Sequence, residues 1–291
     1  MTIHKIGNDR LTVAVDSLGA ELASIKTADG SEWLWQGDPK WWTGRAPILF
    51  PIVGRSPHGV LTIDGKPIKM DTHGFARTSE FSVAEAKPHL VRLRLKDSVA
   101  TRMLYPFPFA LDLVFELDGG TLITRAEVSN TGTTRMPYSL GFHPAFQWPL
   151  PGGEGKKHWI TLAEKEEPPT RRLGEGLMIA HGYQPSVFAE GRYAPAAADF
   201  TNDAVIVDSA RSRSLIFGVD GGPVLETGFA DFPAFGLWQK PGAPYLCIEP
   251  WQGLTPFVGG SDAIEERPGS VWLEAGAMRS FTMTAMPRPK A

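Results

Sequence analysis

Three short stretches place ionisable side chains among apolar and aromatic neighbours. They are GFHPAF around His143, CIEPW around Glu249 and THGFAR around His73. Histidine and glutamate are side chains that commonly give protons to a reacting group or remove them, and reactions that need both steps use two such groups together. The three stretches are therefore the candidates for whatever chemistry the protein carries out.

Strand geometry predicts where the first two groups point. Side chains alternate between the two faces of an extended backbone. His143 is therefore expected to project opposite Phe142 and Phe146, whose rings would anchor the segment in the core. Glu249 is expected on the same face as Cys247, at a strand end beside a tryptophan, in a partly desolvated place. The histidine would then look into a cleft.

The third stretch adds a cation. His73, Phe75 and Arg77 would share one side of the chain if this backbone is also extended. A histidine and a guanidinium would then meet a polar ligand together. Each stretch alone also has a structural explanation, because a buried histidine is more often held by backbone hydrogen bonds than used in chemistry, and Glu249 could be half of a structural ion pair.

The elements that must position these groups are expected to be β-strands. The segments VRLRLK (91–96) and ALDLVFELD (110–118) alternate apolar and polar residues, which is typical of half-buried strands. Turn formers are scattered throughout, with 31 glycines and 25 prolines, and strands and helices do not alternate regularly. The predicted fold is all-β, a large antiparallel sandwich that forms a single domain over residues 1–291.

Two segments are expected to depart from strand structure. The segment DPKWWTG (38–44) is predicted to form a turn or two of helix, because Asp38 could cap it and Pro39 could occupy its first turn. The polar, turn-rich tract 152–176 is predicted to be a long surface connection that borders a cleft.

Composition limits the classes of molecule that this protein is expected to bind. Lys+Arg total 29 and Asp+Glu total 32, for a net charge of -3, and no dense basic run is present, so nucleic acid is not an expected partner. No stretch is long and apolar enough to cross a bilayer and the N-terminus lacks a signal-peptide pattern, so no membrane is expected and the predicted location is cytoplasmic. The single cysteine, Cys247, excludes an intrachain disulfide and a multi-cysteine metal site.

Five stretches, in this order, resemble the aldose 1-epimerase (galactose mutarotase-like) superfamily, in its bacterial LacX-like branch. Each stretch is short, but together they extend over most of the chain, and agreement in order makes chance an improbable explanation. The matching stretches are APILFPIVGR (46–55), HGFAR (73–77), GFHPAF (141–146), NDAVI (202–206) and LWQKPGAPYLCIEPWQG (237–253).

The resemblance implies a β-supersandwich that holds a sugar in an open cleft and needs no metal or organic cofactor. It implies that His143 is the general acid, that Glu249 is the general base and that His73 is a partner histidine that helps to hold the sugar. Arg55 and Arg77 would line the same cleft.

Three aromatic residues are candidates for the apolar surface of such a cleft. Trp238, Trp251 and Phe75 could form a platform for the C–H face of a pyranose ring, although packing in the core explains each of them about as well.

The activity that the resemblance implies is interconversion of the α and β anomers of an aldohexose. An ionised Glu249 would take the proton of the anomeric hydroxyl, and a protonated His143 would give one to the ring oxygen. The expected partner is thus a small-molecule sugar. The oligomeric state is left open between a monomer and a homodimer.

Three alternatives to this activity are open. One is a hexose-6-phosphate mutarotase, in which Arg45, Arg55 and Arg77 bind the phosphate. Another is a sugar-binding protein without catalysis. The third is a metal-dependent enzyme, with zinc or iron held by the two histidines and the glutamate, which ranks low because the three lie on separate segments.

Overall fold

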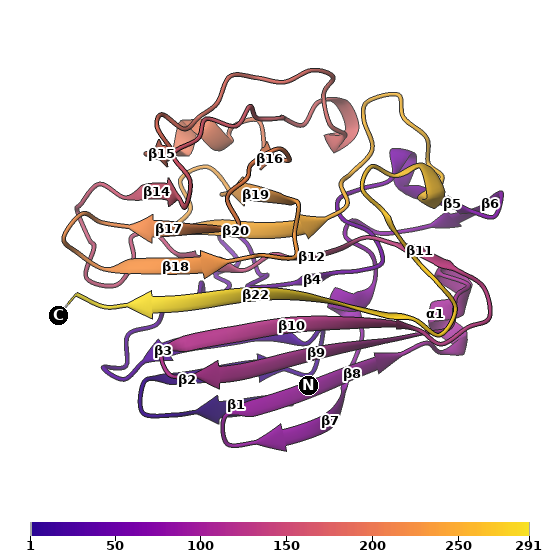
Figure 1. Ribbon diagram of the computed structural model, residues 1–291, viewed down its shortest axis with the longest axis horizontal. Helices are drawn as coiled ribbons and strands as arrows, with labels where there is room; N and C mark the ends of the chain where they lie inside the picture. Colours follow the sequence, from indigo (N-terminus) through magenta and orange to yellow (C-terminus); the bar gives the residue numbers. More distant parts are fainter. Residues whose placement is uncertain (1, 291) are drawn as a thin grey trace.

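The computed structural model describes residues 2–290, and most of its regular structure is β-strand (Figure 1). In this range the strands form antiparallel sheets of nine and six strands, together with three smaller sheets. The helical elements are short. Among the described residues, none of the helices combines the length and apolar character needed to cross a membrane. The predicted all-β, antiparallel class is confirmed.

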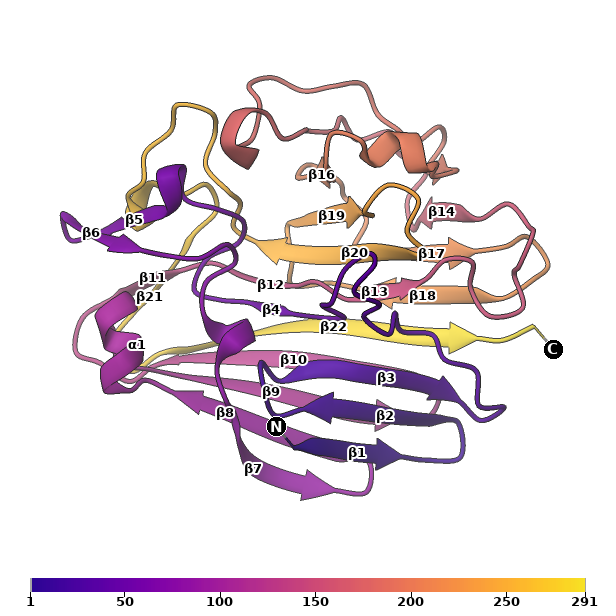
Figure 2. The same ribbon diagram turned by 180° about the vertical axis from the view of Figure 1, so that it is seen from behind.

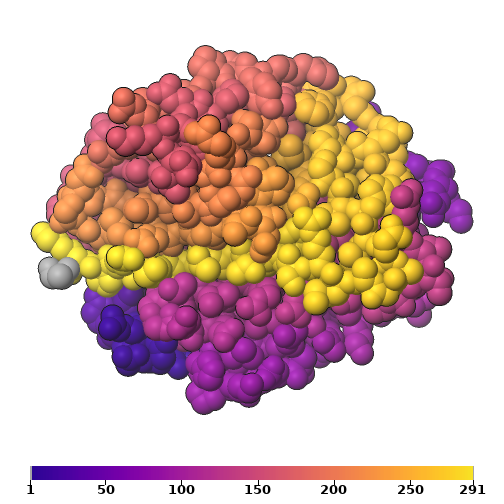
Figure 3. Space-filling view, viewed as in Figure 1, coloured from indigo at the N-terminus to yellow at the C-terminus, as the bar shows by residue number. Residues whose placement is uncertain are grey.

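The nine-stranded sheet spans the length of the molecule. Its long strand β22 pairs with β18 on one side and with β10 on the other, and in Figure 3 the yellow C-terminal segment runs across this face between the earlier and later parts of the chain. The sheet order is β15 (Arg192–Tyr193), β14 (Trp159–Leu162), β17 (Ser214–Gly218), β18 (Val224–Gly228), β22 (Met278–Arg288), β10 (Thr121–Asn130), β9 (Phe109–Asp118), β8 (Leu90–Lys96) and β7 (Ser82–Lys87).

The six-stranded sheet is built around the buried strand β20. Every residue of its strand β20 is buried, and β20 pairs with three other strands. The order is β16 (Val205–Val207), β19 (Ala234–Trp238), β20 (Tyr245–Gln252), β12 (Leu140–Phe142) and β4 (Ile48–Leu49), with β13 (Ala145–Gln147) also paired to β20.

The smaller elements cover the two large sheets. Figure 2 shows the sheet of β1 (Ile3–Gly7), β2 (Leu11–Asp16) and β3 (Glu21–Thr27) in front of β8 and β9. The two hairpin-sized sheets are β5 (Val60–Ile63) with β6 (Lys66–Lys69) and β11 (Met136–Tyr138) with β21 (Val271–Leu273). The helical elements are α1 (Val99–Leu104) and the 3-10 turns η1 (Pro57–Gly59), η2 (Ala76–Thr78), η3 (Glu175–Leu177), η4 (Ala197–Phe200) and η5 (Ile264–Glu266).

The predicted alternation of side chains is confirmed in β8, whereas in β9 five consecutive residues, Leu111 to Phe115, are buried. Val91 and Leu93 are buried in the core, whereas Arg92 and Arg94 lie on the opposite face and pair with Asp112 of the neighbouring strand. Opposite charges on adjacent strands stabilise their pairing. The largest apolar cluster contains residues from Ile6 to Ala285.

Two local predictions need correction. The tract 152–176 does border a cavity, through Leu173, but it is not only a surface connection, because part of it forms β14, which pairs with β17 inside the nine-stranded sheet. The segment 38–44 makes one hydrogen-bonded turn and no helix. In that turn the N–H groups of Trp41 and Trp42 donate to the carbonyl of Asp38. The first turn of a helix is unfavourable because it fixes many backbone angles for few hydrogen bonds. A helix therefore grows beyond one turn only where packing stabilises it.

Candidate active site

Strand register places His143 across from Glu249. Gly141 on β12 is the partner of Trp251 on β20, and Ala145 on β13 is the partner of Cys247. The register is the same before and after the break between β12 and β13, so His143, in the middle of that break, faces Glu249. Two residues 106 positions apart are brought together by backbone pairing alone (249 − 143 = 106).

The two side chains are in direct contact. His143 Nε2 lies 3.1 Å from Glu249 Oε2. Both residues are buried, with 7% and 1% of their surfaces exposed. The rings of Phe142 and Phe146 are packed in the core, which is where the sequence pattern places them. These anchors hold the histidine toward the carboxylate.

Burial disfavours charge on both members of this pair. It lowers the pKa of His143 to about 3 and raises the pKa of Glu249 well above its ordinary value, to which the charge of Asp203 also contributes. The pair therefore keeps one proton over a wide pH range, and burial favours a neutral imidazole beside a protonated carboxyl. This differs from the sequence-based expectation of a standing imidazolium.

His73 approaches the pair from a tight turn. Its backbone has a φ of 67°, and its ring lies edge-on to the ring of His143 at 5.6 Å between centroids. Its Nδ1 accepts a hydrogen bond from the N–H of Gly54 at 3.0 Å. Burial and the charges of His143 and nearby arginines lower the pKa of His73 well below 6.5. A neutral ring with an accepting Nδ1 carries its proton on Nε2, which makes Nε2 a donor.

The turn corrects the predicted placement of Phe75. The stretch 73–77 is not extended, because it passes through the left-handed region at His73 and Gly74 and then enters η2. Phe75 consequently points into the core, where its ring contacts Phe50, and it does not line the cavity. Its predicted contact with sugar is not supported, whereas Arg77 does line the cavity.

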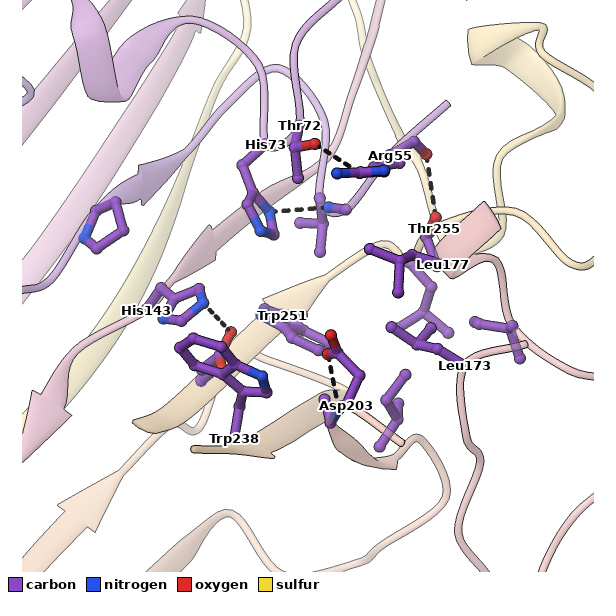
Figure 4. Close-up of a pocket in the computed structure, with 18 of the residues that line it drawn as sticks. Arg55, Thr72, His73, His143, Leu173, Leu177, Asp203, Trp238, Trp251 and Thr255 are labelled. Atoms are coloured by element: carbon purple, nitrogen blue, oxygen red, sulfur yellow. Dashed lines mark hydrogen bonds and ion pairs between the residues drawn. The ribbon is translucent and has the colours of Figure 1, made fainter. Parts of the chain in front are cut away.

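A cavity of ≈ 380 Å³ opens above the pair (Figure 4). Its size lies within the range of small-molecule sites. Figure 4 shows His73 on the same side of the cavity as His143, whereas Arg55, Leu173 and Leu177 lie on the side away from His143. The lining residues are Trp42, Pro47, Val53, Gly54, Arg55, Thr72, His73, Arg77, His143, Leu173, Leu177, Ile179, Asp203, Ala204, Ile206, Trp238, Glu249, Trp251, Leu254 and Thr255.

Two of the predicted aromatic residues, Trp238 and Trp251, line this cavity. The ring of Trp251 lies over glycines on both neighbouring strands: a Cβ at Gly236 would come within 2.5 Å of the ring, and a Cβ at Gly141 within 2.7 Å. Because these two residues have no side chain, the indole ring can lie flat against both strands in the floor of the cavity. The ring of Trp238 meets that of His143 edge-on at 5.7 Å.

Trp42 is a wall residue that the sequence analysis missed. Its ring lies 5.0 Å from the ring of His143, and Gly44 leaves room for it, because a Cβ there would lie 2.6 Å from the indole. The indole N–H of Trp35 donates to the carbonyl of Trp42 and fixes the turn. The signal for this role was the tryptophan pair followed by glycine in the turn-forming segment 38–44.

Asp203 is a second missed residue. It lies in the matched stretch NDAVI, directly before β16, and its carboxylate lines the cavity. Its Oδ1 accepts the N–H of Ala204 at 2.8 Å. Burial raises its pKa. A carboxylate with free oxygens at a cavity wall is a strong acceptor for hydroxyl groups.

The arginines of the cavity have no carboxylate partner. Arg55 and Arg77 both line it, and neither forms a salt bridge with any of residues 2–290. Arg55 Nε donates to Thr72 Oγ1 at 3.0 Å, which orients its guanidinium. Arg45 is not part of the wall, so its predicted contact with a phosphate is not supported.

A ligand set for a metal exists beneath the cavity, but it differs from the predicted one. Atoms of His143, Cys247 and Glu249 lie within 4.8 Å of one another and all three residues are buried, whereas His73 is not a member. Burial raises the pKa of the Cys247 thiol well above its ordinary value, which opposes the thiolate that metals require. The absence of a metal requirement stays a prediction.

Comparison with known proteins decides the family. The aldose 1-epimerase family model matches residues 2–259. The chain belongs to the aldose 1-epimerase family. It is thus an enzyme of the isomerase class, and the resemblance inferred from the five short stretches is confirmed. The comparisons support a general mutarotase function for this aldose 1-epimerase homologue.

Individual relatives agree with this assignment. The homologue is 33% identical over 279 residues to the chromosomal protein LacX of Lactococcus lactis subsp. lactis, covering 92% of this chain and 93% of that protein. A galactose mutarotase related enzyme from Lactobacillus acidophilus has a TM-score of 0.92 and 27% identity, covering 100% of this chain and 98% of that chain. A galactose mutarotase-like protein from Lactobacillus casei has a TM-score of 0.91 and 25% identity, covering 99% of this chain and 100% of that chain.

Proposed function

We propose that this aldose 1-epimerase homologue interconverts the α and β anomers of a free aldohexose. The observation that carries the proposal is the contact of 3.1 Å between His143 Nε2 and Glu249 Oε2 at the wall of a cavity of ≈ 380 Å³. Anomer exchange needs one proton removed from O1 and one delivered to the ring oxygen, and these atoms are held on the same carbon. Two adjacent proton-transfer groups fit that demand.

Ring opening starts from the charged arrangement of the pair, in which Glu249 is a carboxylate and His143 is an imidazolium. Glu249 as carboxylate takes the proton of the anomeric hydroxyl, the bond between C1 and the ring oxygen breaks, and His143 as imidazolium gives its proton to that oxygen. The products are the open aldehyde, a protonated carboxyl and a neutral imidazole. After rotation about the bond between C1 and C2, the ring closes on the other face of the carbonyl with the two roles reversed.

Burial of the pair favours the open-chain stage. The neutral arrangement left after ring opening is the one that burial supports, because burial lowers the pKa of His143 and raises that of Glu249. Both arrangements hold the same single proton, so no proton has to enter from water during the cycle. Hydrogen bonds from bound hydroxyl groups would support the charged arrangement before the ring opens.

The remaining wall residues would bind the sugar. His73 Nε2–H would donate to a sugar oxygen near the pair, and Asp203 would accept a hydroxyl proton farther along the wall. The rings of Trp42, Trp238 and Trp251 would pack against the apolar C–H face of the pyranose. Arg55 and Arg77 would donate to the remaining hydroxyl groups.

Saturation-transfer NMR tests this function. The purified protein is expected to raise the exchange rate between α and β signals of at least one free aldohexose in proportion to enzyme concentration. Spontaneous exchange in buffer is subtracted, and the same sample treated with a chelator shows whether a metal contributes. Tight sugar binding without faster exchange would instead make the protein a sugar-binding module.

A hexose 6-phosphate is a second candidate, favoured by the guanidinium groups of Arg55 and Arg77, which have no carboxylate partner among residues 2–290. Guanidinium forks suit phosphate oxygens. The same exchange measurement with glucose and glucose 6-phosphate, at low and high salt, separates the two. A phosphate-driven site would favour the phosphorylated sugar and weaken with salt, whereas a free-aldose site would favour glucose and respond little to salt.

The acid side of the pH profile follows from the pair. Because burial lowers the pKa of His143 to about 3, the pair of His143 and Glu249 takes up a second proton only in strong acid. The one-proton pair is present above that pKa and is lost as pH falls through it. We expect enzyme-catalysed exchange to stay level as pH falls through 6.5, the ordinary pKa of histidine. Exchange measured by NMR after subtraction of the acid-catalysed background would contradict this if it fell with an apparent pKa near 6.5.

A further inference from the structure

Arg267 lies behind the cavity wall, next to the segment Val53–Ser56. Only 3% of its surface is exposed. Its Nη2 donates to the carbonyl of Val53 at 2.5 Å, and its Nη1 donates to the carbonyl of Arg55 at 3.0 Å and to Ser56 Oγ at 3.2 Å. One guanidinium fork thus binds three groups of a segment more than 200 positions away in the sequence.

The charge of Arg267 is not matched by a carboxylate. It forms no salt bridge with any of residues 2–290, and burial lowers its pKa to about 9, which leaves it charged at neutral pH. A buried cation held only by carbonyl and hydroxyl oxygens is costly. A methionine or leucine would fill the same space at lower cost, so stability alone is a weak explanation for an arginine here.

The segment that Arg267 holds contains the partner of His73. Gly54 N–H donates to His73 Nδ1 at 3.0 Å, and His73 N–H donates to the carbonyl of Gly54 at 2.8 Å. Thr255 Oγ1 donates to the carbonyl of Arg55 from the other side. The orientation of the Gly54 N–H therefore depends on a short backbone segment that is fixed on both flanks, at Val53 and at Arg55, by Arg267.

We propose that Arg267 is a positioning residue that holds Gly54 in place and thereby keeps the proton of His73 on Nε2, facing the sugar. The contact of His73 Nε2–H with a sugar rests on the proposed function. The position of the proton on the His73 ring does not. A bidentate fork is needed because a single ammonium group cannot reach the carbonyls of both Val53 and Arg55 in the same geometry. Without it Gly54 would tilt, and the Nδ1-protonated tautomer of His73 would become populated.

The first experiment uses the wild-type protein. Long-range ¹H–¹⁵N correlation spectra of the protein with ¹⁵N-labelled histidine distinguish protonated from unprotonated ring nitrogens, and a His73→Asn spectrum assigns the signals. We expect His73 to be neutral and protonated on Nε2 at neutral pH. A wild-type His73 that carries its proton on Nδ1 would overturn the proposal, whatever the variants do.

The second experiment uses Arg267→Lys and Arg267→Met, with Arg213→Lys as the control. Arg213 also donates its guanidinium to two backbone carbonyls, those of Ala210 and Ser212, but it is exposed and none of these three residues lines the cavity. It controls for the loss of bonds between an arginine and backbone carbonyls away from the site. In both Arg267 variants we expect a mixture of His73 tautomers. We also expect kcat for anomer exchange to fall on the order of tenfold to a hundredfold, the range for residues that orient a functional group from behind, with a smaller change in KM.

Failure of this proposal and failure of the proposed function are distinguishable. If Arg267→Lys and Arg267→Met keep the wild-type tautomer, and kcat per folded protein equals that of Arg213→Lys, then Arg267 is only structural and the proposal is wrong. If the wild-type protein does not accelerate exchange but the tautomer changes in the variants, the positioning role stands and the proposed function fails. Thermal melting curves give the folded fraction for each variant.

Discussion

Glu249→Gln is expected to lower kcat for anomer exchange by roughly 10²- to 10⁴-fold, the usual contribution of a positioned acid or base. Glutamine matches the size of glutamate and can still bond to His143, but an amide cannot take the anomeric proton. KM is expected to change little, because the lost interaction acts mainly in the transition state. Saturation-transfer NMR over a range of sugar concentrations measures both parameters.

The control for this variant is Glu226→Gln. Glu226 forms a surface pair with Arg288, at 3.0 Å, on the nine-stranded sheet, and it does not line the cavity. Wild-type exchange is expected for the control. A Glu249→Gln variant that exchanges anomers as fast as the control would mean that Glu249 is a structural partner of His143 and not the base. Combining it with His143→Asn should add little, because groups that act as one unit are not additive.

Gly74→Ala is expected to destabilise the protein by roughly 2–5 kcal/mol, from left-handed backbone strain together with overpacking. Gly74 has a φ of 73°, and a Cβ there would lie 2.2 Å from the carbonyl oxygen of Phe50. That oxygen belongs to the backbone and accepts the N–H groups of Phe75 and Ala76, so it cannot move aside freely. The midpoint of urea unfolding, followed by circular dichroism, measures the loss.

Gly65→Ala separates strain from collision. Gly65 has nearly the same φ, 72°, but a Cβ there would meet nothing within 4 Å. It should lose only about 1–2 kcal/mol, the cost of a left-handed alanine. Equal losses in the two variants would contradict the packing argument for Gly74. Because His73 directly precedes Gly74, we also expect the folded fraction of Gly74→Ala, but not of Gly65→Ala, to exchange anomers more slowly than wild type.

Short sequence patterns predicted much of the site correctly. Alternation along GFHPAF predicted that Phe142 and Phe146 would anchor the segment and leave His143 free, and both rings are in the core. The same argument failed for THGFAR, because a glycine at position 74 permits a left-handed turn that removes the alternation. Phe75 therefore entered the core although it lies two residues from His73.

The residues that were missed have weak local signals. Trp42 lies in a segment where a proline and a possible cap suggested helix, and the tryptophan pair followed by glycine is a weak signal that does not show which residue the ring would reach. Asp203 stands in a turn before a short apolar strand, a common place for aspartate in any protein. Their roles depend on which strands become neighbours, and that is not a local property of the chain.

The sequence by itself determined the all-β class, the strands with alternating faces and the separate candidates His143 and Glu249, because side-chain periodicity and residue chemistry are local properties. Their pairing as acid and base was implied only by the family resemblance. Tertiary structure alone decided that the pair is 3.1 Å apart and buried. It also decided that Arg267 supports the wall from the far end of the chain. Distances between strands come from pairing register, and pKa shifts come from burial, and both arise only when distant segments pack together.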